Sequence, residues 1–422
     1  MTNRGRRIAA APISRNLPEL ILMKLAIDGG TPVKTGAFPA WPHYDEQEET
    51  ALLRSLRQGQ WWRATGQENL RFEEEFAAHH GCEHAVTVTN GTVAIELTLL
   101  ALGIEPGDEV IVPAFTFIST SMACQKIGAV PVPVDVLPTT YCIDPKALEA
   151  AITPRTRAII PVHMSGHFSD MDAVLAIAGK HGLAVIQDAA HAHGARGARG
   201  LRIGEWGTTA CFSFQNFKLM TAGEGGIVTC PDAALRERIF LYSNCGRPQG
   251  DRAYQHTVVG TNARMSEFSA AVLRTQLARL DAQTRTREAN AAILRDALAR
   301  MLEIRQQQHG EHATVHPHYM TILTLEHDRH GRPFDRNRVV DCLIAEGIPA
   351  FRAYQALYRI PSFWIAPAPA TTHDALVQAC PATEHIAANG IWIHHRALLG
   401  SREDTLAIAE ALRKVLDGVN AS

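Results

Sequence analysis

The sequence lacks paired cysteines, long apolar segments and a large net charge, and each absence excludes a class of protein. Its 422 residues include eight cysteines but no C-x-x-C pair. Neither a zinc site nor a disulfide framework is therefore indicated, and reduced thiols in the cytoplasm are expected. The formal net charge of −2 provides no basic field for nucleic acid or an anionic membrane. No window approaches about 18 consecutive apolar residues, which argues against a membrane span.

The composition, 46% hydrophobic and 20% charged, is that of an ordinary globular protein. The length suffices for one large and one smaller domain. Near the N-terminus, the apolar stretch Ile8–Ile13 follows three arginines, but Pro12 and Arg15 end it well short of a signal-peptide core. Residues 1–22 are therefore expected to be a loose N-terminal extension.

Seven β-rich runs alternate with helical patterns between residues 84 and 230. The runs are His84–Thr89, Glu109–Val112, Val130–Val134, Ala158–Val162, Leu183–Gln187, Thr209–Phe214 and Gly226–Cys230. Most of them lack polar alternation, as expected for parallel strands that are covered on both faces. The pattern predicts an α/β fold with a mostly parallel, doubly wound sheet, whose ligand lies beyond the carboxyl ends of the strands.

A long helical segment, Ser266–Met301, leads away from this unit. It is followed by a β-rich run at Tyr319–Leu325 and by helical patterns at Arg336–Glu346 and Arg402–Leu416. We therefore expect a large ligand-binding domain over residues 23–285. A smaller C-terminal α+β domain is expected over residues 286–422.

Lys218 is the most informative single residue. It stands between an aromatic run, Phe212–Phe217, and a glycine-rich turn, Gly223–Gly226. Apolar neighbours would strip water from its amine and favour the neutral form, which can act as a nucleophile or base. The pattern therefore predicts a lysine that forms a Schiff base. The alternative is a lysine at a strand end whose charged head reaches solvent.

Asp188 follows the apolar run Leu183–Gln187 and precedes Lys218 by thirty positions. At the end of a neighbouring strand, its carboxylate could keep the ring nitrogen of a pyridine cofactor protonated. An aspartate in this position also commonly caps a turn. Together with Lys218, it points to pyridoxal 5'-phosphate as the cofactor.

Such a cofactor needs an anion site for its phosphate. Asn90, Gly91 and Thr92 lie between a predicted strand and a predicted helix, where backbone N–H groups and the Thr92 hydroxyl could bind phosphate. The Asn-Gly pair also marks many ordinary turns. Ser213 could add another hydroxyl. Phe117 could stack on the pyridine ring, with core filling as the alternative.

Six segments together resemble the DegT/DnrJ/EryC1/StrS family of fold-type I pyridoxal phosphate enzymes, over nearly all of the chain after residue 23. They are Val88–Thr92, Glu109–Phe117, Pro161–Gly166, Gln187–Ala195, Phe212–Gly226 and Gly260–Phe268. The resemblance implies that Lys218 is the Schiff-base lysine and catalytic base. It also implies that Asp188 partners the pyridine nitrogen and that Phe117 or His191 lies against the ring.

The resemblance further implies that Thr92, Ser213 and Gln215 lie near the phosphate and the cofactor hydroxyl. Asn262 would reach the phosphate bound by a neighbouring subunit. The family therefore predicts a homodimer with shared active sites and a small-molecule substrate.

A second set of segments resembles a subgroup of this family. They are Phe38–Pro42, Gly59–Arg63, Phe76–Gly81, Cys245–Pro248 and His394-His395. The subgroup implies either dehydration and aromatisation of an aminated carbocycle, with His191 or Lys218 as proton donor, or transamination of a keto-sugar or cyclitol by glutamine or glutamate. A catalytically idle partner subunit that binds the cofactor is a third possibility.

Phe217 departs from the subgroup, which has a small residue at this position. Its ring could narrow the substrate pocket.

Substrate contacts are expected from polar or aromatic residues in segments that the family places at the cleft. They are Trp62, Arg63, Tyr319, Arg352, Tyr354, His394 and His395. The alternatives are a surface position for Arg352 and a core or interface position for the histidine pair.

Overall fold

The computed structural model describes residues 24–308, 310 and 312–419. The extension expected at residues 1–22 lies outside this range. In the described part of the chain, no helix is long and apolar enough to cross a membrane.

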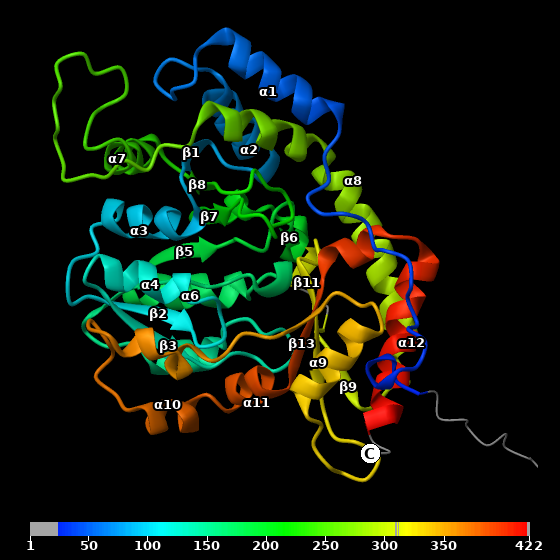
Figure 1. Cartoon of the computed structure of the whole chain (residues 1–422). Coiled ribbons are helices and arrows are strands. Elements are labelled where there is room, and N and C mark those ends of the chain that lie inside the picture. The colour runs from blue at the N-terminus through cyan, green and yellow to red at the C-terminus, as the bar shows by residue number, and fades with distance from the viewer. Residues whose placement is uncertain (1–23, 309, 311, 420–422) are drawn as a thin grey trace, which may run out of the picture.

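The large domain is built on a seven-stranded sheet (Figure 1). Its strands are β1 (His84–Val88), β2 (Glu109–Pro113), β3 (Val130–Val134), β4 (Thr156–Ile159), β5 (Ala184–Asp188), β7 (Thr209–Ser213) and β8 (Gly226–Cys230). Their order is β1-β8-β7-β5-β4-β2-β3, and only β8 runs antiparallel to its neighbours. The predicted mostly parallel α/β sheet is confirmed.

Helices cover both faces of this sheet. They are α3 (Gly91–Ala101), α4 (Ser119–Lys126), α5 (Pro145–Ala150), α6 (Met171–His181) and α7 (Ala233–Ser243). Along β2, Val110 and Val112 pack into one hydrophobic core, whereas Ile111 packs into the other. Successive side chains of a strand point to opposite faces. Burial of both faces explains why the strands read as continuous apolar runs.

The small domain contains a four-stranded antiparallel sheet of order β12-β13-β11-β9. Its strands are β9 (Ile304–Gln306), β11 (Met320–Leu325), β12 (Ala350–Arg352) and β13 (Gly390–His394). The accompanying helices are α9 (Arg336–Ala345), α11 (Pro381–Asn389) and α12 (Arg402–Val419), whereas α10 (His373–Ala379) packs Leu376 into a core of the large domain. A short two-stranded ladder, β6 (Arg196–Gly197) with β10 (Ala313–Val315), also joins the domains.

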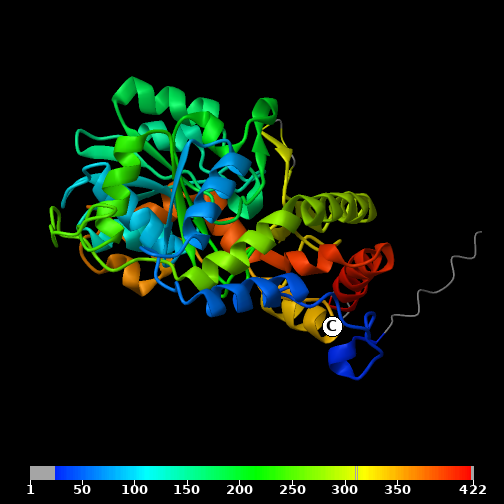
Figure 2. The same ribbon diagram turned by 90° about the horizontal axis from the view of Figure 1, so that it is seen from above.

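The long helix α8 (Glu267–Leu298) belongs to both domains. It begins beside the large sheet and runs to α12, with α1 (Glu46–Gln58) packed along it (Figures 1 and 2). The domain division expected at residue 285 therefore falls inside a continuous helix. Leu25 and Phe38 pack in the small-domain core. Residues 24–38 thus lie with the small domain, although the sequence placed them with the large one.

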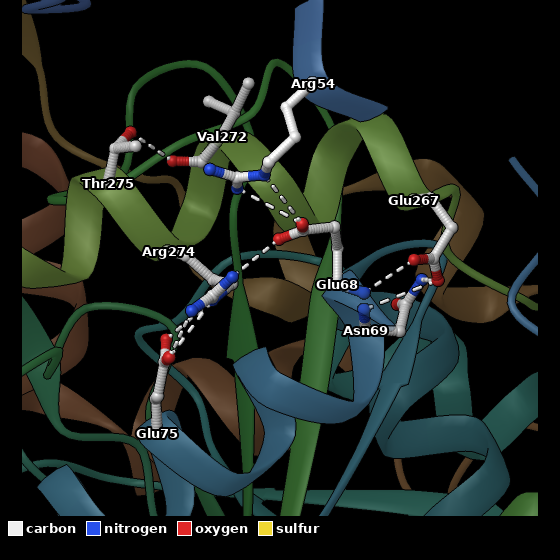
Figure 3. Close-up of polar contacts among 8 residues, drawn as sticks. All are labelled: Arg54, Glu68, Asn69, Glu75, Glu267, Val272, Arg274 and Thr275. Atoms are coloured by element: carbon white, nitrogen blue, oxygen red, sulfur yellow. Dashed lines mark hydrogen bonds and ion pairs between the residues drawn. The ribbon is translucent and has the colours of Figure 1, made fainter. Parts of the chain in front are cut away.

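A polar network fastens α8 to α2 (Glu68–His80) (Figure 3). The fully buried carboxylate of Glu267 accepts hydrogen bonds from the backbone N–H of Glu68 at 2.6 Å and from the side-chain amide of Asn69 at 2.6 Å. Glu267 therefore caps the N-terminus of α2, whose own preceding residue, Gln67, makes no side-chain cap. Nearer the surface, Arg274 joins the carboxylates of Glu68 and Glu75.

Replacing Glu267 by alanine is expected to lower the free energy of unfolding by about 3 kcal/mol, because buried N–H groups would lose a charged acceptor. Urea unfolding measures the change. Glu75→Ala is the matched control: the Glu75 side chain is 42% exposed, so its loss should cost less than about 1 kcal/mol. Equal losses for the two variants would contradict the capping role.

Candidate active site

A cavity of about 720 Å³ opens at the carboxyl edge of the parallel strands. The large domain lines it with Asn90, Gly91, Thr92, Phe117, Thr120, Asp188, His191, Ser213, Gln215 and Lys218. The small domain contributes Tyr319, Phe351, Arg352, Tyr354, Trp392 and His394. The structure therefore brings together, in one cavity, most of the cofactor residues that the sequence analysis selected.

Lys218 lies in the turn between β7 and β8 and is only 9% exposed. Its Nζ is 3.4 Å from the Tyr319 hydroxyl and 4.5 Å from the centre of the Tyr319 ring. Two donors hold the backbone of the turn. Trp41 donates from Nε1 to the carbonyl of Asn216 at 2.9 Å, and His395 donates from Nε2 to the carbonyl of Phe217 at 3.1 Å. The amine is thus both buried and fixed in position.

Asp188 ends β5 with its carboxylate in the same cavity. Burial raises the pKa of Asp188, while the Thr120 hydroxyl, the Ala190 N–H and the charge of Lys218 oppose this rise. Thr120 donates to Oδ2 at 2.8 Å, and the backbone N–H of Ala190 donates to Oδ1 at 3.2 Å. A cationic ring nitrogen beside this carboxylate would favour its ionised form.

The start of α3 has the groups that could form a cradle for a phosphate. Asn90 caps the helix by accepting from the N–H of Val93 at 2.9 Å, and the first N–H groups of a helix have no partner within it. The Thr92 hydroxyl contacts that of Ser119 at 2.8 Å. A Cβ at Gly91 would lie 2.7 Å from Cβ of Ser213, so only glycine fits this close approach.

His191 lines the cavity with its ring stacked on that of Tyr319, at 4.1 Å between centres. Its Nδ1 accepts from the backbone N–H of Ser165 at 3.3 Å. Burial, followed by the nearby charge of Lys218, holds the pKa of His191 well below its usual value. The imidazole is therefore neutral, which does not favour the expected role of His191 as a proton donor.

Phe117, its neighbour Phe115 and Asn262 lie in different environments. Phe117 lines the cavity and is 51% exposed, whereas Phe115 is buried in the core. Asn262 is exposed, bridges to Asn244 through the backbone and does not line this chain's cavity.

The expected substrate residues divide into two groups. Tyr319, Arg352, Tyr354 and His394 line the cavity. Trp62, Arg63 and His395 do not.

Trp62, Arg63 and His395 were expected to contact the substrate, but in this chain they lie elsewhere. Trp62 is half exposed at the surface. Arg63 is buried in an ion pair with Glu73, 2.6 Å between nitrogen and oxygen. His395 instead supports the lysine turn.

Thr120, Ser119 and Trp41 also contribute to the site, although they were not among the residues predicted from the sequence. Ser119 and Thr120 stand two and three positions after Phe117, so the available signal was a pair of hydroxyls close behind the aromatic segment that follows β2. Trp41 acts through a contact with Asn216 across 175 positions, which no local pattern indicates.

The sequence matches the DegT/DnrJ/EryC1/StrS aminotransferase family over residues 43–413, and the chain belongs to this family. Enzymes of the family depend on pyridoxal phosphate, and the residues present fit that cofactor. They comprise a buried lysine amine, a buried carboxylate and an anion cradle that a Cβ at Gly91 would fill.

Individual relatives are similar over nearly the whole chain. The 3-amino-5-hydroxybenzoate synthase of Amycolatopsis mediterranei strain S699 is 50% identical over 381 residues, covering 90% of this chain and 97% of that protein. The L-glutamine:2-deoxy-scyllo-inosose aminotransferase of Streptomyces fradiae is 37% identical over 417 residues, covering 93% and 97%. The crystal structure of a 3-amino-5-hydroxybenzoic acid synthase matches with a TM-score of 0.88 and 48% identity, covering 92% of this chain and 100% of that one.

Buried histidines make the stability of this protein sensitive to acid. Burial lowers the pKa of His163 to about 4, that of His193 to about 3 and that of His394 to about 4, from 6.5. Below pH 6.5 the unfolded chain therefore binds protons that the folded chain does not. Stability should be fully present above pH 6.5 and fall as the pH drops toward 4.

Each such histidine should contribute a slope of about 1.4 kcal/mol per pH unit in this window. Urea unfolding at a series of pH values between 7 and 5 measures the slope. His163→Gln, which lies outside the cavity lining, should reduce the slope by about one proton. A free energy of unfolding that stays constant over this range would contradict the expectation.

Proposed function

We propose that this protein is a pyridoxal phosphate-dependent 3-amino-5-hydroxybenzoate synthase, which dehydrates and aromatises aminodehydroshikimate in antibiotic biosynthesis of the ansamycin or mitomycin type. The observation that carries the proposal is the 50% identity to such a synthase over 90% of the chain. The cofactor residues alone do not discriminate, because transamination and dehydration begin with the same proton removal.

Each group of the site has a task in this reaction. When bound, pyridoxal phosphate supplies an electron sink for the carbon that bears the substrate amine. Asp188 holds a proton at the ring nitrogen. The amine of Lys218, fixed by its anchored turn, removes the proton from the amine-bearing carbon. Loss of the adjacent hydroxyl as water and tautomerisation then give the aromatic product, which makes the sequence irreversible.

The cavity walls suit a small carboxylated ring. Phe117, Phe217 and Phe351 provide exposed aromatic faces, each between 43% and 51% exposed. We assign the polar substrate contacts to Arg352, Tyr354 and His394, which come from the small domain. Arg352 is paired with Asp341 at 2.8 Å but remains 45% exposed, so its guanidinium is accessible to a carboxylate.

A cyclitol or keto-sugar aminotransferase is the second candidate. The 37% identity to the scyllo-inosose aminotransferase over 93% of this chain favours it. In that reaction glutamine or glutamate would supply the amine, and no hydroxyl would leave the ring. The amino-donor requirement therefore separates the two candidates.

We further propose that the protein works in the cytoplasm as a homodimer with shared active sites. The position of Asn262 supports the dimer, since this side chain is exposed and outside its own cavity. The eight cysteines, all free thiols, support a reducing compartment.

Incubation of the purified protein with aminodehydroshikimate, without any amino donor, is expected to produce an aromatic absorbance. Lys218→Ala should abolish this product, because the base that removes the proton is lost. Lys180→Ala is the control, since this lysine is paired with Glu149 at the surface, 65% exposed. Conversion that requires glutamine would favour the aminotransferase, and turnover by Lys218→Ala would exclude the assigned base.

Mixing two inactive variants tests the shared sites. If Asn262 serves the partner's cavity, a mixed dimer of Lys218→Ala and Asn262→Ala contains one site with both defects and one intact site. Random assortment should then restore about a quarter of the wild-type activity. Activity no greater than the average of the two variants would contradict shared sites.

A further inference from the structure

Tyr319 contacts Lys218, but proton removal by Lys218 does not use its hydroxyl. It precedes β11, is 4% exposed and lines the cavity. Its backbone N–H donates to the carbonyl of Ser165 at 2.9 Å. The stacked ring of His191 covers one face of the phenol ring. Backbone and side chain are therefore both held in place.

The two segments that hold Tyr319 are themselves conformationally restricted. Ser165 and His318 have φ values of +63° and +52°, in the left-handed region that non-glycine residues rarely adopt. A Cβ at Gly166 would lie 2.7 Å from Pro317 and 2.9 Å from the carbonyl oxygen of His191. Strain of this kind persists where the surrounding structure fixes it and is frequent at active sites.

The phenol is positioned to exchange a proton with the catalytic lysine. Its oxygen lies 3.4 Å from Nζ of Lys218, close enough for a hydrogen bond that tightens once substrate binds. The neutral, stacked His191 does not compete for this role. If the hydroxyl leaves from the same face of the ring as the proton that Lys218 removes, it departs on the side where Lys218 and Tyr319 lie.

We propose that Tyr319 is the catalytic proton donor for the leaving hydroxyl, an inference that rests on the proposed dehydration. Lys218 takes the proton from the amine-bearing carbon, and the electron pair of that C–H bond becomes the new carbon–carbon double bond. The neighbouring C–O bond breaks with its electron pair on oxygen. Tyr319 donates its phenolic proton to that oxygen, and water departs. The phenolate then recovers a proton from the Lys218 ammonium, so both residues return to their starting state.

Tyr319→Phe separates the two proton transfers, because it removes one oxygen and keeps the ring. Water loss should fall at least about 10²-fold, as expected for loss of a general acid. Exchange of the substrate proton at the amine-bearing carbon with solvent deuterium, which needs only Lys218, should stay within about threefold of wild type. Equilibrium dialysis of the cofactor-free protein should give a cofactor affinity within about twofold of wild type.

Tyr141→Phe is the matched control. Tyr141 is also a buried tyrosine whose hydroxyl makes one side-chain contact, with Thr324 at 2.8 Å, but it lies outside the cavity lining. This variant should keep wild-type rates of both exchange and water loss.

The outcomes are distinguishable. Equal loss of exchange and water loss in Tyr319→Phe, or weakened cofactor binding, would make Tyr319 a structural residue and overturn the proposal. Undiminished water loss would also overturn it while leaving the synthase function intact. If the wild-type protein releases no water from aminodehydroshikimate, the proposed function itself fails and this inference fails with it.

Discussion

The antiparallel strand β8 lies between β1 and β7, and the position of the active site depends on this pairing. Gly226, the first residue of β8, pairs with Val88 at the end of β1 and with Ser213 at the end of β7. The chain between Ser213 and Gly226 must therefore turn back over the carboxyl edge of the sheet, and Lys218 lies in that turn. A side chain at Gly226 would meet the backbone of Asn90 at 2.4 Å, so the pairing also brings the anion cradle beside the lysine.

Burial then determines which groups of the site carry charge. The histidines near the cavity are held neutral, since desolvation penalises the imidazolium form. Among the groups that line the cavity, the carboxylate of Asp188 and the guanidinium of Arg352 remain able to carry charge. In a region of low dielectric constant, fixed charges of this kind act more strongly on a reacting centre than they would in water.

The strands and most site residues of the large domain could be predicted from the sequence because their patterns are local. Buried parallel strands give continuous apolar runs, and Asn90, Asp188, Ser213 and Lys218 each follow such a run. The run predicted up to Val162 is interrupted after Ile159, since Pro161 has no N–H to donate, and a single parallel bridge between Val162 and Asp188 follows. The contacts of Trp41 and His395 could not be predicted, since each depends on a partner from a distant segment. Arg63 lies in the turn before α2 and pairs with a buried carboxylate of that helix, which no local pattern indicates. The packing of Leu25 and Phe38 in the small-domain core likewise depends on contacts between distant segments.

The hydrogen bond from His395 to the turn that holds Lys218 couples the position of the lysine to the shape of the substrate pocket. His395 directly follows β13, the strand that also presents His394 and Trp392 to the cavity. Substitutions that reshape this wall for a different ring would also shift the hydrogen bond that holds Phe217, and with it the lysine. Chimeras that exchange the small domain between relatives would therefore inherit a changed nucleophile position along with a changed pocket. New specificity in this scaffold should arise more readily through compensated pairs of substitutions than through single exchanges.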